Sequence, residues 1–173
     1  MWLTVLDKMQ NVSDYQQHQL LSGFFEAYDK RPFCFRDTGE HIVLLSNQKP
    51  KTECREITFS DGQALLFECR ASVRGRSCAG VKIKPEQYTA KHLKEWFVRR
   101  LLPAANVQYV TFKKMSPHKI LRNDGRLMIL NQTLFYGTLI VNDAKAFDEL
   151  VGHGIGAGGA FGFGALILPQ VMS

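Results

Sequence analysis

GHGIGAGGAFGFGALIL, residues 152–168, is the stretch of this 173-residue chain on which the interpretation of its fold depends. Glycine has no Cβ, so such a run lets the backbone take left-handed angles and approach a phosphate or a neighbouring helix closely. Successive N–H groups can also form a concavity that binds an anion. The candidate phosphate contacts are therefore Gly154, Gly156, Gly158 and Gly159. The alternative is a close-packed turn without a ligand.

The order of elements around these glycines argues against a nucleotide cofactor. Asn142 can cap a helix that carries Ala144, Phe147 and Val151 on one face, and an apolar strand, residues 165–168, follows the glycines. A dinucleotide fingerprint needs the reverse order, with a strand before its glycines and a helix after them. The Gly-Lys-Ser/Thr ending of a Walker-type loop is also missing. We expect no cofactor.

In the second half of the chain, the predicted order is strand, helix, strand, strand, helix and, after the glycines, strand. These elements are expected at residues 63–73 with 81–84, 86–102, 107–113, 133–141, 142–151 and 165–168, with a hairpin turn at 122–125. The first half begins in the same way. Its elements are expected at residues 2–6, 13–28, 33–36, 41–46 and 56–59, the last forming a hairpin with 63–73 across Ser60-Asp61-Gly62.

Two such halves predict an α+β protein of tandem ferredoxin-like (RRM-like) βαββαβ domains with antiparallel sheets. The N-terminal domain is expected at residues 1–72 and contains the 13–28 helix. The C-terminal domain is expected at residues 73–173 and contains a basic hairpin and the glycine-rich loop.

Composition favours a polyanionic partner. The formal charge is +6 and the pI is about 9.2, which in a small protein favours nucleic acid. None of the four cysteines forms a Cys-x-x-Cys pair, so a zinc site is not expected. Asp7 and Lys8 interrupt the one apolar run at the N-terminus, and residues 165–168 are too few to span a bilayer. We expect a cytoplasmic protein that has no membrane partner.

The 13–28 helix carries the best catalytic candidates. Ser13 and Gln16 have the spacing of a capping box. On the helix that follows, Leu20 and Leu21 face one side, whereas Tyr15 and His18 are neighbours on the opposite, polar side. An imidazole with a reference pKa of about 6.5 suits proton transfer near neutral pH. An exposed or structural histidine is the alternative.

Two basic sets are candidates for binding RNA phosphates. The first is the hairpin set Lys113, Lys114, His118, Lys119, Arg122 and Arg126, which could grip a duplex or enter its groove. The second is Arg70, Arg74 and Arg76, near the junction of the halves. The alternative for the hairpin is a soluble edge protected by its lysines.

The two βαββαβ halves, the Tyr-x-x-His helix and the glycine-rich loop together resemble one family, the CRISPR-associated type I-E (Cascade) endoribonucleases that process precursor crRNA, members of the RAMP superfamily. DYQQHQLL, residues 14–21, and TLFYGTLIVNDAKAFDELVGHGIGAGGAFGFGALILP, residues 133–169, carry the resemblance. LFECRASV, residues 66–73, matches more loosely.

The resemblance implies that His18 is the catalytic histidine and Tyr15 its companion. It implies metal-independent cleavage at the 3′ base of a CRISPR repeat stem-loop, by attack of the 2′-OH, to leave a 2′,3′-cyclic phosphate and a 5′-OH. It also implies partners, namely the crRNA and Cascade-type subunits. The accessory lysine or arginine of the family has no clear match in this chain.

Two other functions stay open. The chain could be a non-catalytic subunit that binds an RNA hairpin in the same kind of complex. It could also be a general RRM-like module that stacks RNA bases on aromatic side chains of its sheet. The candidates for such stacking are Phe33, Phe35, Tyr109 and Phe112, although burial in the core is the alternative for each.

Overall fold

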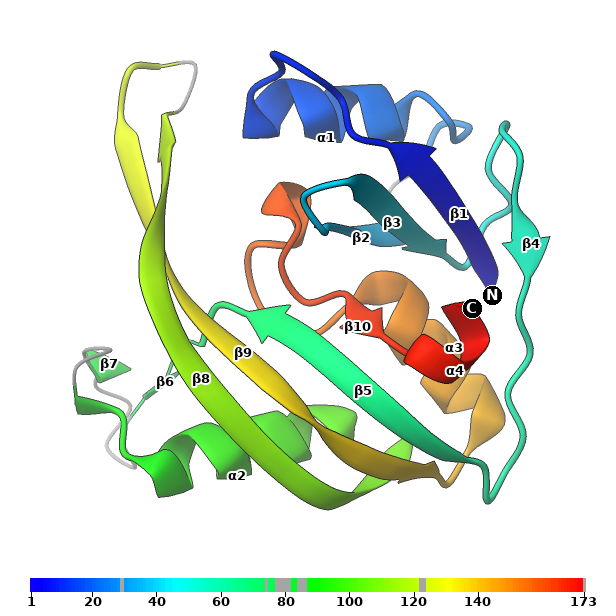
Figure 1. Cartoon of the computed structure of the whole chain (residues 1–173), viewed down its shortest axis with the longest axis vertical. Helices are drawn as coiled ribbons and strands as arrows, with labels where there is room; N and C mark the ends of the chain where they lie inside the picture. The colour runs from blue at the N-terminus through cyan, green and yellow to red at the C-terminus, as the bar shows by residue number, and fades with distance from the viewer. Residues whose placement is uncertain (29, 74, 77–81, 84–86, 122–123, 173) are drawn as a thin grey trace.

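The computed structural model describes residues 1–28, 30–73, 75–76, 82–83, 87–121 and 124–172, and for 75–76 and 82–83 it describes the backbone alone. The first half forms an antiparallel sheet in the order β2-β3-β1-β4, with α1 packed on one face (Figure 1). Its elements are β1 (Trp2–Asp7), α1 (Asp14–Ser22), β2 (Phe33–Asp37), β3 (His41–Ser46) and β4 (Arg55–Glu56).

The second half forms another antiparallel sheet, in the order β10-β5-β9-β8. Its elements are β5 (Ala64–Ala71), α2 (Ala90–Leu101), β8 (Ala105–Leu121), β9 (Leu127–Val141), α3 (Ala144–His153) and β10 (Leu166–Ile167). Short elements complete the described chain: β6 (Gly75–Arg76), β7 (Lys82–Ile83), η2 (Gly159–Phe161) and α4 (Pro169–Met172). The α+β class with tandem ferredoxin-like sheets is therefore confirmed.

One predicted pairing is wrong. Residues 56–59 and 63–73 were expected to form a hairpin, but β4 pairs with β1, whereas β5 pairs with β9 and β10. The turn between them passes the chain to the second sheet, because Gly62 N–H donates to the Val141 carbonyl at 2.8 Å and Val141 N–H donates to that of Gln63 at 2.9 Å. The domain boundary between residues 72 and 73 stays a prediction; β5, which precedes it, pairs with strands that follow it.

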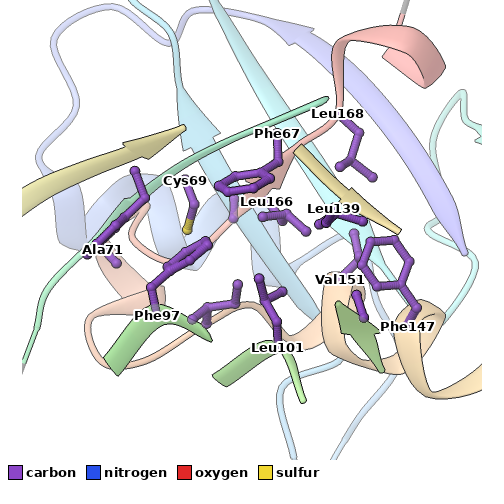
Figure 2. Packing of buried hydrophobic residues seen from close by; sticks show 14 of the residues in the cluster. Phe67, Cys69, Ala71, Phe97, Leu101, Leu139, Phe147, Val151, Leu166 and Leu168 are labelled. Carbon is purple, nitrogen blue, oxygen red and sulfur yellow. The ribbon is translucent and has the colours of Figure 1, made fainter. Parts of the chain in front are cut away.

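The core explains how the glycine-rich loop is positioned. Helix α2 packs against the second sheet, and α3 lies between the main core and strands β2 and β3 of the first sheet; Figure 2 shows Phe97 of α2 beside Phe67, and Phe147 and Val151 of α3 near Leu139. A smaller cluster lies beneath α1 and includes Leu21 and Phe33, both fully buried. A third cluster joins the β8–β9 hairpin to the loop and consists of Ile120, Leu130 and Phe163. The loop is thus held between the main core and the hairpin.

The β8–β9 hairpin extends well beyond its sheet and reaches the side of α1 (Figure 1). Irregularities in its pairing fall between Val107 and Tyr109 and between Met115 and His118. Near the second of these, His118 Nε2 lies 3.1 Å from an Asp14 carboxylate oxygen at the start of α1. The basic hairpin and the candidate catalytic helix are therefore in direct contact.

The four aromatic residues proposed for base stacking do not form one exposed platform. Phe33 and Phe35 are fully buried, and Phe112 is partly buried against the main core. Tyr109 alone of the four is largely exposed, at 60%. Burial in the core, the alternative stated for these residues, is therefore confirmed for Phe33 and Phe35.

Candidate active site

Helix α1 begins as its sequence predicts. The Ser13 hydroxyl accepts from Gln16 N–H at 3.3 Å, and the Gln16 side chain accepts from Ser13 N–H at 2.9 Å, so the capping box is formed. The helix ends at Ser22, earlier than the expected residue 28. After Ser22 the backbone turns, and Phe25 N–H donates to the Ser22 carbonyl at 3.1 Å. The turn directs Phe25 into the small core beneath the helix.

The buried face of α1 differs from the expected one at two side chains. Leu21 is fully buried, but Leu20 is 51% exposed and the polar Gln17 is buried. Tyr15 is exposed by 39%, as expected for the polar side. His18 lies at the edge between the two faces and is partly buried. The expectation that His18 lies wholly on the polar face therefore needs correction.

The His18 ring rests on Phe33, with the ring centroids 5.7 Å apart and the planes inclined by 30°. Its Nε2 atom is buried and has no hydrogen-bond partner. Burial lowers the pKa of His18 below its usual 6.5, and the nearby positive charge of Arg31 lowers this pKa further. The imidazole is therefore neutral near pH 7, the state in which it can accept a proton.

Arg31 is the residue that sequence reasoning missed. Its guanidinium carbon lies 5.7 Å from the centre of the same Phe33 ring that His18 contacts. Its Nε atom is buried without a hydrogen-bond partner, and no carboxylate of the described residues forms an ion pair with it. Burial lowers the pKa of Arg31 because it disfavours the charged form. The site thus holds a partly desolvated cation whose charge no carboxylate of the described chain neutralises.

The glycine-rich loop adapts closely to its surroundings. A Cβ on Gly159 would overlap Nη2 of Arg31, so the guanidinium fits here only because residue 159 is glycine. Gly156 has φ of +83°, and a Cβ on it would lie 2.9 Å from the Trp96 ring. Similar contacts surround the other two candidates, with Cys34 beside Gly154 and Leu130 beside Gly158. A packing role is therefore seen for all four glycines, and contact with phosphate stays a prediction.

The first basic set follows the hairpin. Lys113, Lys114 and Lys119 on β8 and Arg126 before β9 are exposed. Lys114 Nζ donates to the Tyr88 carbonyl at 3.0 Å, which holds that ammonium against the segment before α2. His118 differs from the lysines because it pairs with Asp14 and lies 5.9 Å from the Phe163 ring. Arg122 lies outside the described residues.

In the second basic set, Arg70 contacts the C-terminal part of the glycine-rich loop. Arg70 Nη2 donates to the Gly162 carbonyl at 3.2 Å, and the guanidinium lies 4.7 Å from the centre of the Phe163 ring. Burial lowers the pKa of Arg70, and the nearby Arg36 adds to this effect. Arg74 lies outside the described residues, and for Arg76 only the backbone, in β6, is described.

The described part of the chain contains no cluster of three or more His, Cys, Asp or Glu side chains arranged to hold a metal ion. None of its described helices combines the length and the apolarity that crossing a membrane requires. What the structure brings together is His18, Tyr15, Arg31 and Gly159, with His118 joined to the same helix through Asp14. Such a set can transfer a proton and stabilise negative charge on a phosphate.

Comparison with known proteins gives consistent matches over almost the whole chain. A family described as CRISPR associated protein matches residues 4–169. The CRISPR system Cascade subunit CasE of Escherichia coli K12 is 29% identical over 192 aligned positions, which cover 91% of this chain and 92% of the relative.

Two solved structures are similar along their full length. The crystal structure of the CRISPR-associated protein Cas6e from Escherichia coli K-12 has a TM-score of 0.73 and 26% identity, covering 97% of this chain and 98% of that one. The CRISPR endoribonuclease Cse3 bound to a 19-nucleotide RNA has a TM-score of 0.76 and 21% identity, covering 97% and 99%.

Proposed function

The chain belongs to the family of CRISPR-associated proteins, and on that premise we propose that it is a metal-independent endoribonuclease that cuts the repeat stem-loop of precursor crRNA. Two of its similar proteins bear names that support this, a Cascade subunit and an endoribonuclease solved with RNA. The observation that carries the proposal is the neutral His18 imidazole beside the Arg31 guanidinium, which no carboxylate of the described residues neutralises.

The proposed reaction is an attack of a ribose 2′-hydroxyl on the adjacent phosphate. The 2′-oxygen forms a bond to phosphorus and loses its proton to a base, while the bond to the 5′-oxygen breaks and that oxygen gains a proton. The products are a 2′,3′-cyclic phosphate and a 5′-OH. His18 performs one of the two proton transfers, and such a group contributes about 10²- to 10⁴-fold to the rate.

In this mechanism Tyr15 and Arg31 assist His18. The partly exposed phenol of Tyr15, three residues before His18 on α1, orients the phosphate or the ribose. Arg31 stabilises the additional negative charge that develops on the phosphate oxygens in the transition state. This assigns to Arg31 the role of accessory cation, for which the sequence offered no candidate. No step in the scheme requires a metal ion.

The exposed lysines of the β8–β9 hairpin are proposed to hold the backbone of the stem. Lys119 lies on the part of the hairpin that projects beyond β5, whereas Lys113 lies on β8 within the sheet; the projecting part contacts the start of α1 through His118 and Asp14. A duplex held there has its base near the start of α1. After cleavage the protein is proposed to keep the stem-loop as a subunit of a Cascade-type complex in the cytoplasm.

One observation favours a second candidate function, a non-catalytic subunit that binds the hairpin. The Nε2 atom of His18 is buried against Phe33, so that nitrogen cannot meet an RNA linkage in the arrangement described. Cleavage therefore requires either that Nδ1 faces the RNA or that the ring turns when RNA binds. The second candidate predicts tight binding of the hairpin without product.

The test is cleavage of the host's own repeat hairpin in EDTA under single-turnover conditions. We expect wild-type protein to cut and His18→Ala to lose about 10²-fold or more in rate. His92→Ala is the matched control, because His92 is exposed on α2 and contacts Thr89, and its rate should equal that of the wild type. Equal rates for His18→Ala and wild type would end the assignment, and binding without cutting by wild type would establish the second candidate.

A further inference from the structure

A basic cavity lies on the side of the glycine-rich loop opposite the hairpin. Its volume is about 670 Å³, and Gly154, Gly156 and Ala157 form one wall. Residues farther along the same loop face the hairpin instead, since Gly158 contacts Leu130 and Phe163 packs with Ile120. The loop therefore separates the cavity from the hairpin.

The charge of this cavity has one sign. Lys30, Arg31, Arg100 and His153 line it, and no carboxylate does so among the described residues. A concave site lined by one sign of charge concentrates ions of the other sign. His153 Nδ1 donates to the Glu149 carbonyl at 2.8 Å, so in the neutral ring Nε2 is an acceptor, and the phosphate-binding groups are the lysine and the two arginines. The lining is suited to phosphate groups.

Buried donors in the cavity wall lack partners. Trp96 is 7% exposed, and its Nε1 is buried without an acceptor among the residues that the structure describes. The Nε atom of Arg31 is in the same state. The Arg100 guanidinium lies 5.6 Å from the centre of the Trp96 ring and extends from the exposed end of α2. Both atoms are shielded in the structure described, so the groups that a ligand in the cavity meets first are the exposed side chains of Lys30 and Arg100.

Arg31 connects the cavity to the candidate active site. It lines the cavity, and it also contacts Phe33, on which His18 rests. A chain held at His18 can thus continue past Arg31 into the cavity without crossing the hairpin. For a cut at the 3′ base of a stem, the stem precedes the cut linkage, and a single strand follows it.

We propose that this cavity binds the single-stranded RNA that continues 3′ from the cut linkage, with Lys30 and Arg100 holding its first phosphates. The inference rests on the proposed function, because it takes the position of the cut from it. It adds a second RNA-binding site, distinct from the hairpin, that recognises the strand to be released. The stem is held on one side of the glycine-rich loop and the departing strand on the other.

The test compares two hairpins made non-cleavable by a 2′-deoxyribose before the cut linkage, one ending at the stem base and one with a three-nucleotide 3′ extension. Wild-type protein is expected to bind the extended hairpin about tenfold more tightly, the effect of one charge-assisted contact. The gain should weaken with salt, with an added log–log slope of about −0.7 for each phosphate held. Lys30→Gln with Arg100→Gln should remove most of the gain.

Arg99→Gln is the matched control for Arg100→Gln. Both arginines are exposed in the last turn of α2, but Arg99 lies outside the cavity lining and contacts the Glu95 carbonyl. The control should keep the full gain, and thermal unfolding of all variants shows that each is folded.

Equal binding of the two hairpins by wild type would overturn this inference alone. An equal gain from a 5′ extension, or from the extended hairpin after both cavity substitutions, would overturn it as well. Failure of wild type to bind either hairpin would overturn the proposed function and the inference together. Because the RNA cannot be cut, none of these outcomes depends on catalysis by His18.

Discussion

Replacing Arg31 with methionine should reduce cleavage strongly without reducing stability. The structure contains no carboxylate paired with this guanidinium among its described residues, and its Nε is buried without a partner. Removing an unpaired guanidinium from water lowers the free energy of unfolding, by several kcal/mol if the burial is complete. Methionine keeps most of the side-chain volume and removes that cost. It also removes the contact with Phe33, which contributes about 0.5–1 kcal/mol. The free energy of unfolding should therefore be unchanged or increased.

The effect on cleavage has the opposite sign. Removing one preorganised group that stabilises transition-state charge costs about 10²- to 10³-fold in rate, equivalent to about 2.7–4 kcal/mol. Arg31 meets the condition for a value in this range, because it is partly desolvated and in place before RNA binds. Arg31→Lys retains a charge but loses the planar fork, so its rate should fall between those of methionine and wild type.

The assay is single-turnover cleavage in EDTA at saturating protein, together with urea unfolding of the same samples. Arg99→Met removes one charge from the exposed surface of α2 and should leave both quantities near the wild-type values. The reasoning is refuted if Arg31→Met cuts within about threefold of wild type. It is also refuted if the variant loses about 2 kcal/mol or more of stability, since Arg31 would then be chiefly a structural residue.

Three further results are expected. The free energy of unfolding should fall as the pH drops below about 6.5, the ordinary pKa of histidine, because His18 takes up a proton in the unfolded state more readily than in the folded state. His18→Gln should make the free energy of unfolding depend less on pH. If urea unfolding between pH 5 and 8 gave the same pH dependence for this variant as for wild type, the burial of His18 would be wrong. Gly159→Ala should displace the mobile end of the Arg31 side chain and slow cleavage at least tenfold, at little cost in the free energy of unfolding. A single-turnover rate equal to that of wild type would contradict the contact between Gly159 and Arg31. A double-mutant cycle on Asp14 and His118 should give a coupling of about 0.2–1 kcal/mol that disappears in 1 M salt, and zero coupling at low salt would mean that the hairpin is not held to α1 in this way.

The parts of the fold that the sequence predicts are those with local causes. Ser13 and Gln16 form their capping box because the interacting groups are three residues apart. The glycine-rich loop was expected between a helix and a strand, and it lies between α3 and β10. Such features depend on backbone preferences that act within a few residues.

The parts that could not be predicted depend on distant segments. Pairing with β9 decides that residues 63–73 join the second sheet and do not turn back on residues 56–59. The sequence alone could not show this, because the same alternation of side chains fits both arrangements. Leu20 and Gln17 exchanged their expected environments because α1 packs on Phe33 and its neighbours, whose positions the helix sequence does not contain.

The position of Arg31 in the site also depends on distant segments and could not be predicted from the sequence. Arg31 belongs to no motif, and it follows α1 after a turn whose geometry the sequence leaves open. What places it is a contact with Gly159, far along the chain, and with Phe33. The sequence offers the basic pair Lys30-Arg31 before the strand that begins at Phe33, and nothing in it distinguishes one of the two as the cation of the site.

The chemical identity of the cut ends tests the account most directly. The repeat hairpin is incubated with wild-type protein in EDTA, and the masses of both fragments are measured. Attack by the 2′-hydroxyl requires that the upstream fragment end in a 2′,3′-cyclic phosphate and the downstream fragment begin with a 5′-OH, and that His18→Ala yield little of either. An upstream 3′-OH with a downstream 5′-phosphate would mean that water or another nucleophile performs the reaction, and the role assigned to His18 would be wrong.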